Sequence, residues 1–364
     1  MATSADRIVS WYVGFHKHVL ATPRFSQVLK LFPDSVDDLR DINRSRQMHR
    51  NAYLAILGHL DEAGRVYFVE AVDDYVRNTL RVPPLDGHRA DGTGAFVSEM
   101  KEKGYTTLPP VDRDKVARMK SFLRPHKVWA GDYEPTEPLC KLDEARSENV
   151  ANYPPETMVA CPHLVDLATD PAVLAVVEGY LGTAPIILGV TGWWSFADNP
   201  GAKDAQLYHM DGDDYRFCKL FVQLTDVDED GGPHTFVEGS HDWNTVRALR
   251  EKWSGGPVEF NEWYFGTLRK ADDKVERVFG MKGVKFTGPA GTRFLVDTSG
   301  IHKGTPPVKA DRLMAQVLYG VTPHAQAPLL ACRFPIPAGS LKGARVPKRV
   351  ADPPFDYVTW LFLT

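Results

Sequence analysis

From Ile186 onward the chain is a succession of short runs in which apolar and polar residues alternate, separated by glycine, proline and other turn-forming residues. Alternation with a period of two predicts strands that have one buried face. Six such runs occur, and they read IILGVTGWWSFA, RFCKLFVQLTDV, HTFVEGSH, GVKFTGP, TRFLVDTSGIH and RLMAQVLYGVTP. Strands this short, at this spacing, predict an antiparallel sandwich or barrel.

The residues before Ile186 have a different pattern, in which helical periodicity predominates. The proline- and glycine-rich segment 81–94 is typical of a linker or long loop. Residues 104–123 predict a strand, a turn and a helix, and residues 170–185 predict a helix that ends at Gly182. The fold class expected from both halves is mainly β with helical bracing.

The expected domain organisation has three parts. A helical N-terminal extension covers residues 1–95, a β-rich core covers 96–340, and a tail over 341–364 packs back on the core through its apolar end. Nothing in the helical extension decides its role. It could be a surface through which copies of the chain associate, a cover for the core or a scaffold.

Composition argues against several classes of function. The chain has 364 residues, of which 43% are hydrophobic and 25% charged, as in ordinary globular proteins. A formal net charge of −4 gives no electrostatic basis for binding nucleic acid, and no apolar run approaches the roughly 18 residues of a membrane span. The four cysteines are scattered, which indicates free thiols in a reducing compartment. With a first segment unlike a secretory signal, these features predict a cytoplasmic protein.

Two His-x-Asp pairs occur, and only one has the geometry of a metal clamp. His59 and Asp61 lie in a segment with helical periodicity, where residues two apart do not face each other. His209 and Asp211 lie in the short segment AQLYHMD, which precedes a turn and a predicted strand. On an extended strand, side chains two apart point to the same side. His209 and Asp211 could therefore grip one ion, or they could be two polar residues in a turn.

A metal centre for oxygen chemistry needs few protein ligands, because open positions must remain for substrate and O2. Two histidines and one carboxylate on one face suit non-haem Fe(II). His302, at the end of a predicted strand, is the best candidate for the second histidine, and His234 and His241 are weaker competitors. Arg312 opens the next predicted strand, and its guanidinium could reach back beside the metal and bind a carboxylate through two hydrogen bonds.

The ordered set of these motifs resembles the phytanoyl-CoA dioxygenase-like branch of the Fe(II)/2-oxoglutarate oxygenases. The likeness covers residues 104–323 and is carried by YHMDGDDYRFCKLFVQLTDVDEDGGPHTFVEGSH and PAGTRFLVDTSGIHKGTPPVKADR. It implies a double-stranded β-helix, which is a jelly-roll or cupin-like barrel of two antiparallel sheets braced by helices. The first ~90 residues match nothing in the family's pattern.

The resemblance also implies the chemistry. His209, Asp211 and His302 would hold Fe(II), and Arg312 would bind the far carboxylate of 2-oxoglutarate, whose 2-oxo acid end chelates the iron. O2 would convert this cosubstrate to succinate and CO2 while an unactivated C–H bond of a small-molecule substrate is oxidised. Halogenating relatives lack the acid, so Asp211 favours hydroxylation or another oxidation.

Other side chains are candidates for contact with cosubstrate or substrate. Lys219 lies on one face of a predicted strand, although a merely packed or solvated face is an equal alternative. Gln316 is on the same side of its strand as the predicted anion anchor, and Thr305 stands near a position where some relatives have serine. Trp193 and Trp194 point to opposite faces of their strand, so one should line the pocket and the other should pack outside.

An insertion between predicted strands spans about residues 242–279. In the family that the sequence resembles, such a stretch often covers the active site. Trp263 and Tyr264 could close over a substrate, and the basic residues Arg247, Arg250, Arg269 and Lys270 could meet an anionic one. The alternative is a packed helical segment with an ordinary charged face.

Two other functions remain open. One is a cupin-like metalloenzyme that uses no 2-oxo acid, and Arg312 argues against it because such an enzyme needs no buried guanidinium there. The other is a barrel that has lost catalysis and acts as a binding module. An intact set of two histidines and an aspartate argues against this, since a degenerate site should lose a ligand first.

Overall fold

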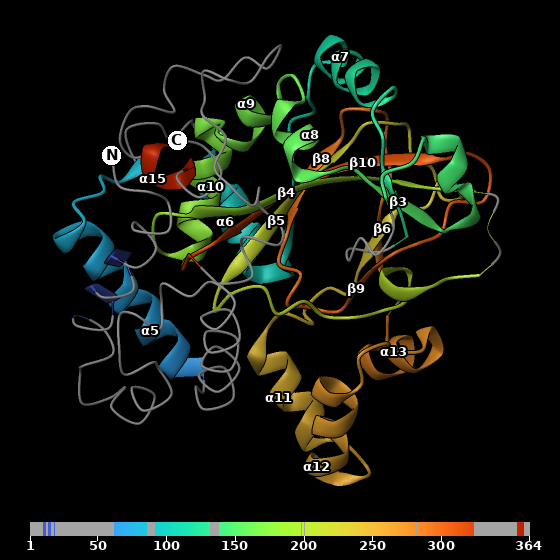
Figure 1. Ribbon diagram of the computed structural model, residues 1–364. Helices are drawn as coiled ribbons and strands as arrows, with labels where there is room; N and C mark the ends of the chain where they lie inside the picture. The colour runs from blue at the N-terminus through green and yellow to red at the C-terminus, as the bar shows by residue number, and fades with distance from the viewer. Residues whose placement is uncertain are drawn as a thin grey trace.

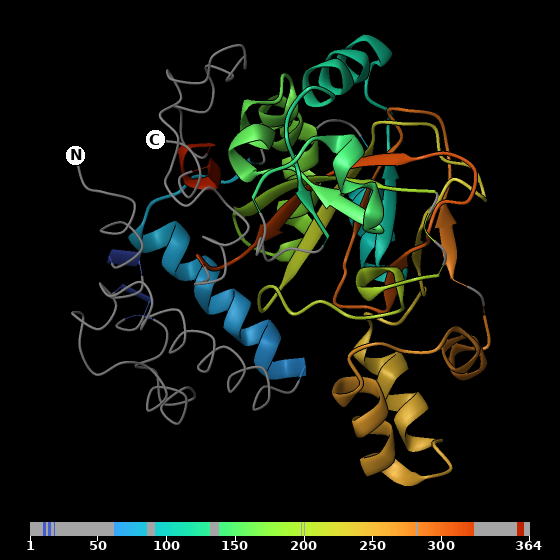
Figure 2. The ribbon, with the colours of Figure 1, turned by 45° about the vertical axis from the view of Figure 1, so that its right-hand side comes forward.

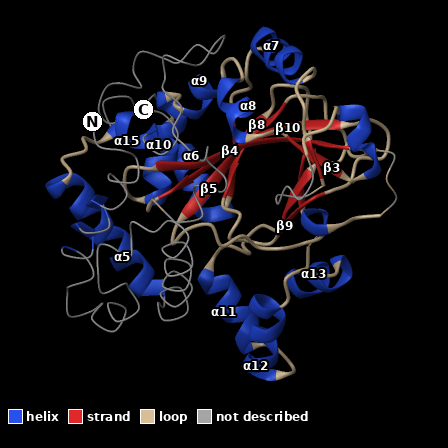
Figure 3. Ribbon diagram, in the orientation of Figure 1, coloured by secondary structure: helices blue, strands red, loops and turns tan. Residues whose placement is uncertain are grey.

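The computed structural model describes residues 62–85, 92–131, 138–197, 199, 201–281, 283–323 and 355–359, together with residues 10, 11, 14, 15 and 18. Strands gather into one body, helices brace it on one side, and a separate group of helices projects from the opposite side (Figure 1; Figure 3). None of the described helices is both long and apolar enough to cross a membrane.

The larger sheet has seven strands, all antiparallel to their neighbours. In spatial order they are β1 (Tyr105–Leu108), β8 (Arg293–Val296), β5 (Phe217–Gln223), β10 (Arg312–Gly320), β4 (Ile186–Ser195), β3 (Val150–Asn152) and β2 (Trp129–Ala130). The central strand β10 pairs with β4 and β5, so that Gln316 lies opposite Thr191 on one side and Phe221 on the other. Every residue of β5 and β10 is buried, because both faces of the sheet are covered.

The smaller sheet has three strands in the order β7 (Val284–Phe286), β6 (His234–Phe236) and β9 (His302–Gly304). A bridge between His209 and His302 adds the segment around His209 to its edge. Phe221 and Phe294 of the larger sheet form one apolar cluster with Phe236 and Phe286 of the smaller sheet. The two sheets therefore enclose a common interior, as predicted for a double-stranded β-helix.

Each of the six predicted runs contains a strand, but one prediction was wrong in its extent. The run TRFLVDTSGIH was read as a single strand that ends at His302. In the structure β8 ends at Val296, and His302 opens the separate strand β9. The cause is a turn at Asp297, whose Oδ1 accepts hydrogen bonds from Ser299 N at 3.0 Å and Ser299 Oγ at 2.6 Å.

Helices cover the outer face of the larger sheet. They are α6 (Thr93–Lys103), α7 (Arg113–Leu123), α8 (Pro155–Ala160), α9 (Leu164–Ala168) and α10 (Pro171–Leu181), with the 3-10 turn η5 (Leu142–Ser147) at the far edge. As predicted, α10 ends at Gly182, whose φ of 85° suits glycine. The side chain of Asp170 caps its start by accepting from Ala172 N.

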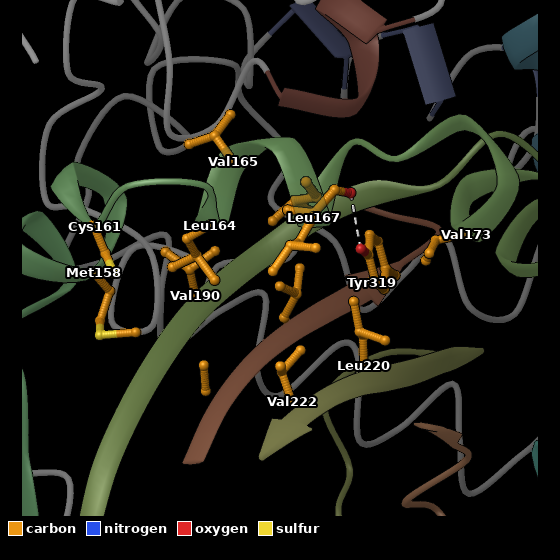
Figure 4. Close-up of a cluster of buried hydrophobic side chains, with 14 of the residues drawn as sticks. Met158, Cys161, Leu164, Val165, Leu167, Val173, Val190, Leu220, Val222 and Tyr319 are labelled. Atoms are coloured by element: carbon orange, nitrogen blue, oxygen red, sulfur yellow. Dashed lines mark hydrogen bonds between the residues drawn. The ribbon is translucent and has the colours of Figure 1, made fainter. Parts of the chain in front are cut away.

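The core beneath these helices is apolar and closely packed (Figure 4). Leu164 and Leu167 face Val190 of β4, and Leu220 of β5 belongs to the same cluster. The hydroxyl of Tyr319 on β10 donates to the carbonyl of Ala168 at 2.8 Å, so its one polar atom is satisfied inside the core. This layer fixes the strands that carry the interior side chains.

A second cluster joins the N-terminal helices to one end of the barrel. It contains residues of α5 (Glu62–Asp74) and of the π-helical turn η3 (Tyr75–Thr79), which pack against Leu188, Phe217 and Leu318. Trp11 belongs to this cluster, and its Nε1 donates to the hydroxyl of Tyr357 in α15 (Phe355–Thr359) at 3.3 Å. The limits predicted for the extension, core and tail remain predictions.

The residues between β6 and β7 form the projecting group of helices (Figure 2). These are α11 (Trp243–Glu251), α12 (Gly256–Asn261), the π-helical turn η7 (Glu262–Gly266) and α13 (Asp272–Phe279). Their apolar side chains form one buried cluster with Tyr208, Val237 and Ile301. The group is therefore anchored on segments that adjoin the smaller sheet.

Candidate metal centre

Three of the predicted side chains, those of His209, Asp211 and His302, come together at the edge of the smaller sheet. One ligand atom from each lies within 4.8 Å of the others. His302 Nε2 is 3.2 Å from Asp211 Oδ2, and His209 Nε2 is 3.7 Å from Asp211 Oδ1. This is the only such group of three or more potential ligands among the residues that the structure describes.

Backbone pairing places these side chains. His209 and His302 exchange two N–H···O hydrogen bonds, each of 2.9 Å, so they are directly opposite and their side chains share one face. Asp211 N donates to Thr298 O at 2.8 Å, which ties the acid to the turn before β9. A 3-10 turn, η6 (Asp204–Gln206), leads into this segment. The pair His209 and Asp211 is therefore held in extended backbone rather than in a turn.

The histidine rings are oriented for metal binding. Nδ1 of His209 lies 2.8 Å from Leu207 O, and Nδ1 of His302 lies 2.9 Å from Gly300 O. Because a carbonyl can only accept, each Nδ1 carries a proton, which leaves Nε2 as the nitrogen that can bind a metal. Burial, with the neighbouring His302, lowers the pKa of His209 to about 3, so its imidazole is neutral at physiological pH. Two imidazoles and a carboxylate fit a divalent transition metal.

Lys219 contacts the acid of this group rather than standing apart. Its Nζ lies 2.6 Å from Asp211 Oδ2 and 2.8 Å from Asp213 Oδ2, and its side chain is buried. Burial alone would raise the pKa of Asp211, but Lys219 and His302 hold it well below its usual range. The two carboxylates likewise hold the pKa of Lys219 above its usual range despite burial. Contact of Lys219 with cosubstrate remains a prediction.

Replacing Lys219 with methionine should destabilise the metal-free protein by roughly 3–5 kcal/mol, because it leaves two buried carboxylates without their shared cation. A bound divalent ion would then supply the missing charge. We therefore expect the Tm of the metal-free Lys219→Met protein to fall and the rise in Tm on adding Mn(II) to exceed that of the wild type. Calorimetry with and without Mn(II) measures both quantities.

The matched control is the double variant Lys219→Met/Asp213→Asn, which removes one positive and one negative charge. It should recover much of the lost Tm in the metal-free protein. A Lys219→Met protein as stable as the wild type without metal would contradict the charge balance inferred at this site.

Arg312 lies in the interior near the ligand group and is 3% exposed. Its Nη2 donates to Ser195 Oγ at 2.9 Å and its Nη1 donates to Gly232 O, and both acceptors are neutral. A Cβ built on Gly304 would lie 3.4 Å from Nη2. Since Gly304 is two residues beyond His302 on β9, the guanidinium lies beside this strand at a point roughly 7 Å along its backbone from His302. A dicarboxylate of a few carbons could bridge that span.

Further predicted residues face the same interior. Gln316 follows Arg312 by four positions on β10 and so lies on the same face, where it is 8% exposed. Trp193 packs edge-on against Phe221 inside the barrel, whereas Nε1 of Trp194 donates to Tyr153 OH in the outer layer. Trp193 is therefore the inward member of the pair.

Other predicted residues lie outside the three-residue ligand group. Thr305 Oγ1 is 3.0 Å from Thr235 Oγ1 on β6, and contact of Thr305 with cosubstrate remains a prediction. Trp263 and Tyr264 are buried in the core of the projecting helices, and Tyr264 OH donates to Ser240 O at 2.6 Å. His234 is outside the three-residue group, although its ring stacks on that of His302 with centroids 5.4 Å apart. A covering role for the two aromatic residues remains a prediction.

Sequence reasoning missed Ser195 and Asp213. Ser195 is the residue of β4 directly opposite Arg312, so a correct alignment of the predicted strands would have placed it beside the guanidinium. Asp213 is two positions beyond Asp211, and that spacing was the available signal.

No protein-family model matches the sequence, and no curated protein matches it. Among solved structures, the chain is similar to the non-heme alpha ketoglutarate dependent epimerase SnoN from nogalamycin biosynthesis, with 18% identity and a TM-score of 0.40 over 62% of this chain and 81% of SnoN. HygX from Streptomyces hygroscopicus, with nickel and 2-oxoglutarate bound, has 18% identity and a TM-score of 0.39 over 62% and 86%. EctD from S. alaskensis with bound Fe has 17% identity and a TM-score of 0.40 over 61% and 74%. These similarities are distant, so what the site can bind is inferred from its own side chains.

Proposed function

We propose that this protein is a non-haem Fe(II)/2-oxoglutarate-dependent oxygenase of the phytanoyl-CoA dioxygenase-like type, which oxidises a C–H bond of a small metabolite. The observation that supports this best is the convergence of His209, Asp211 and His302 on the same interior as the buried guanidinium of Arg312. Metal ligands alone would fit many metalloenzymes. A fixed cation beside them is what a dicarboxylate cosubstrate requires.

The residues take distinct roles in this proposal. His209, Asp211 and His302 hold Fe(II), and Lys219 fixes the orientation of Asp211. Arg312 binds the far carboxylate of 2-oxoglutarate. Bound Fe(II) and 2-oxoglutarate, with O2, supply the oxidising power and release succinate and CO2.

The protein's own contribution is to orient the bound groups and to keep water out. Trp193 and the phenylalanines of the interior cluster make an apolar wall between the sheets. Gln316 offers a polar amide on the same face as Arg312. Because Asp211 is present, we favour hydroxylation over halogenation as the outcome. We further propose that the protein is cytoplasmic and acts on a small molecule.

The two alternatives make different demands on these residues. A cupin-like enzyme without a 2-oxo acid gives no function to Arg312. A binding barrel gives no function to two histidines whose Nδ1 atoms contact carbonyls and whose Nε2 atoms face Asp211. The geometry therefore supports the oxygenase over either.

Turnover of the cosubstrate tests the proposal. The protein, loaded with Fe(II) and supplied with O2 and 2-oxoglutarate, should release succinate, and one member of a metabolite survey should accelerate that release. The same protein with a chelator is the control. Succinate release that does not exceed the chelated control, with or without any metabolite, would refute the proposed function.

A further inference from the structure

The segment that returns from the projecting helices runs beside the metal ligands. Lys270 N donates to Tyr208 O at 2.8 Å, and these two residues form an antiparallel bridge. Arg269 directly precedes Lys270, so its backbone lies beside that of His209. A side chain as long as that of arginine can reach the ligand group from this position.

Arg269 is a cation without an acidic partner among the residues that the structure describes. Its side chain is half-buried, and it has no ion pair or hydrogen bond with any residue that the structure describes. Burial, with the charge of Arg269, lowers the pKa of the neighbouring Lys270 to about 8.

The charges of the loaded site identify Arg269 as a surplus cation. With the proposed function, the divalent metal contributes two positive charges, and Lys219 and Arg312 contribute one each. Asp211, Asp213 and the two carboxylates of 2-oxoglutarate carry four negative charges, which balance them. Arg269 is then the cation at the edge of the ligand group that nothing within the site offsets.

We propose that Arg269 binds an oxyanion of the substrate, a carboxylate or a phosphate, and so holds the molecule against the metal centre. This inference rests on the proposed function and names the substrate class: a small metabolite with at least one anionic group. A guanidinium suits this role because it remains protonated and binds either oxyanion through two parallel hydrogen bonds. Arg269 is thus a specificity-determining residue contributed by the segment between β6 and β7.

Inorganic phosphate is the probe for this site. The protein is loaded with Mn(II) and saturating 2-oxoglutarate, so that Arg312 is occupied, and phosphate is titrated while its 31P relaxation is followed. The 31P nucleus of a phosphate held beside the paramagnetic Mn(II) should relax faster than that of free phosphate. This enhancement should saturate as the site fills. We expect Arg269→Met to weaken this phosphate binding about tenfold or more, as for loss of a charged hydrogen-bonded contact.

Arg250→Met is the matched control, because Arg250 is an exposed arginine at the end of α11 in the same projecting group. It should retain the relaxation enhancement of the wild type. Enhancement that is absent in the wild type, or equal in Arg269→Met, overturns the inference while leaving the proposed function intact. Electron paramagnetic resonance of the bound Mn(II) separates failure of this inference from failure of the proposed function. A wild-type protein that binds no Mn(II) overturns both.

Discussion

Replacing Asp211 with alanine should remove metal binding and, with it, succinate release. Loss of a residue that only supports a ligand typically costs 10–100-fold in metal affinity, so loss of the charged ligand itself should cost at least about 100-fold. The fold should survive, because Lys219 keeps its contact with Asp213 at 2.8 Å. Titration with Mn(II), followed by electron paramagnetic resonance, measures the affinity.

Asp213→Asn is the matched control for this experiment. Asp213 is a buried neighbour of the same lysine, but it lies outside the three-residue ligand group. We expect it to retain Mn(II) affinity within about tenfold of the wild type. An Asp211→Ala protein that binds Mn(II) as tightly as the wild type would show that another acid is the ligand.

Replacing Arg312 with alanine should weaken 2-oxoglutarate binding about thirty-fold or more. A buried, hydrogen-bonded charge pair that loses one partner costs roughly 2–5 kcal/mol, and the far carboxylate of the cosubstrate would lose its cation. Arg312→Lys keeps the charge without the two-pronged geometry, so its loss should be intermediate. Calorimetric titration of 2-oxoglutarate into the Mn(II)-loaded proteins gives the three affinities.

Mn(II) affinity is the internal control, because Arg312 is not one of the ligands and its removal should leave metal binding intact. Equal 2-oxoglutarate affinities in the wild type and Arg312→Ala would remove the cosubstrate assignment. They would favour a metalloenzyme that uses no 2-oxo acid.

The strands of the barrel were predictable because short apolar runs between turn-forming residues mark strands, although alternation predicted one exposed face and β5 and β10 are buried throughout. The ligand pair was predictable because side chains two apart in extended backbone point to the same side, as those of His209 and Asp211 do. The separation of β9 from β8 was missed, although the sequence Asp297-Thr298-Ser299-Gly300 contained the turn signal.

What the sequence could not predict depends on contacts between distant segments. Alternation shows that Trp193 and Trp194 face opposite ways, but only packing against Phe221 identifies the inward one. Lys219 was expected near the cosubstrate, yet its closest partners are two acids whose position depends on how the loop after Asp211 folds. The environment of Trp263 and Tyr264 was also not predictable, because the sequence alone does not distinguish aromatic side chains that cover a pocket from those that pack in a helical core.

The most direct test of the central claim is anaerobic titration of 2-oxoglutarate into the Fe(II)-loaded protein while the metal-to-ligand absorption band is followed. The band requires the metal and the 2-oxo acid to be bound to each other, so it reports on both halves of the site at once. We predict a saturable band in the wild type, no band in His302→Ala, and a band in Arg312→Ala that needs at least about thirty-fold more 2-oxoglutarate. A wild-type protein that binds Fe(II) but develops no band at saturating 2-oxoglutarate would contradict the account.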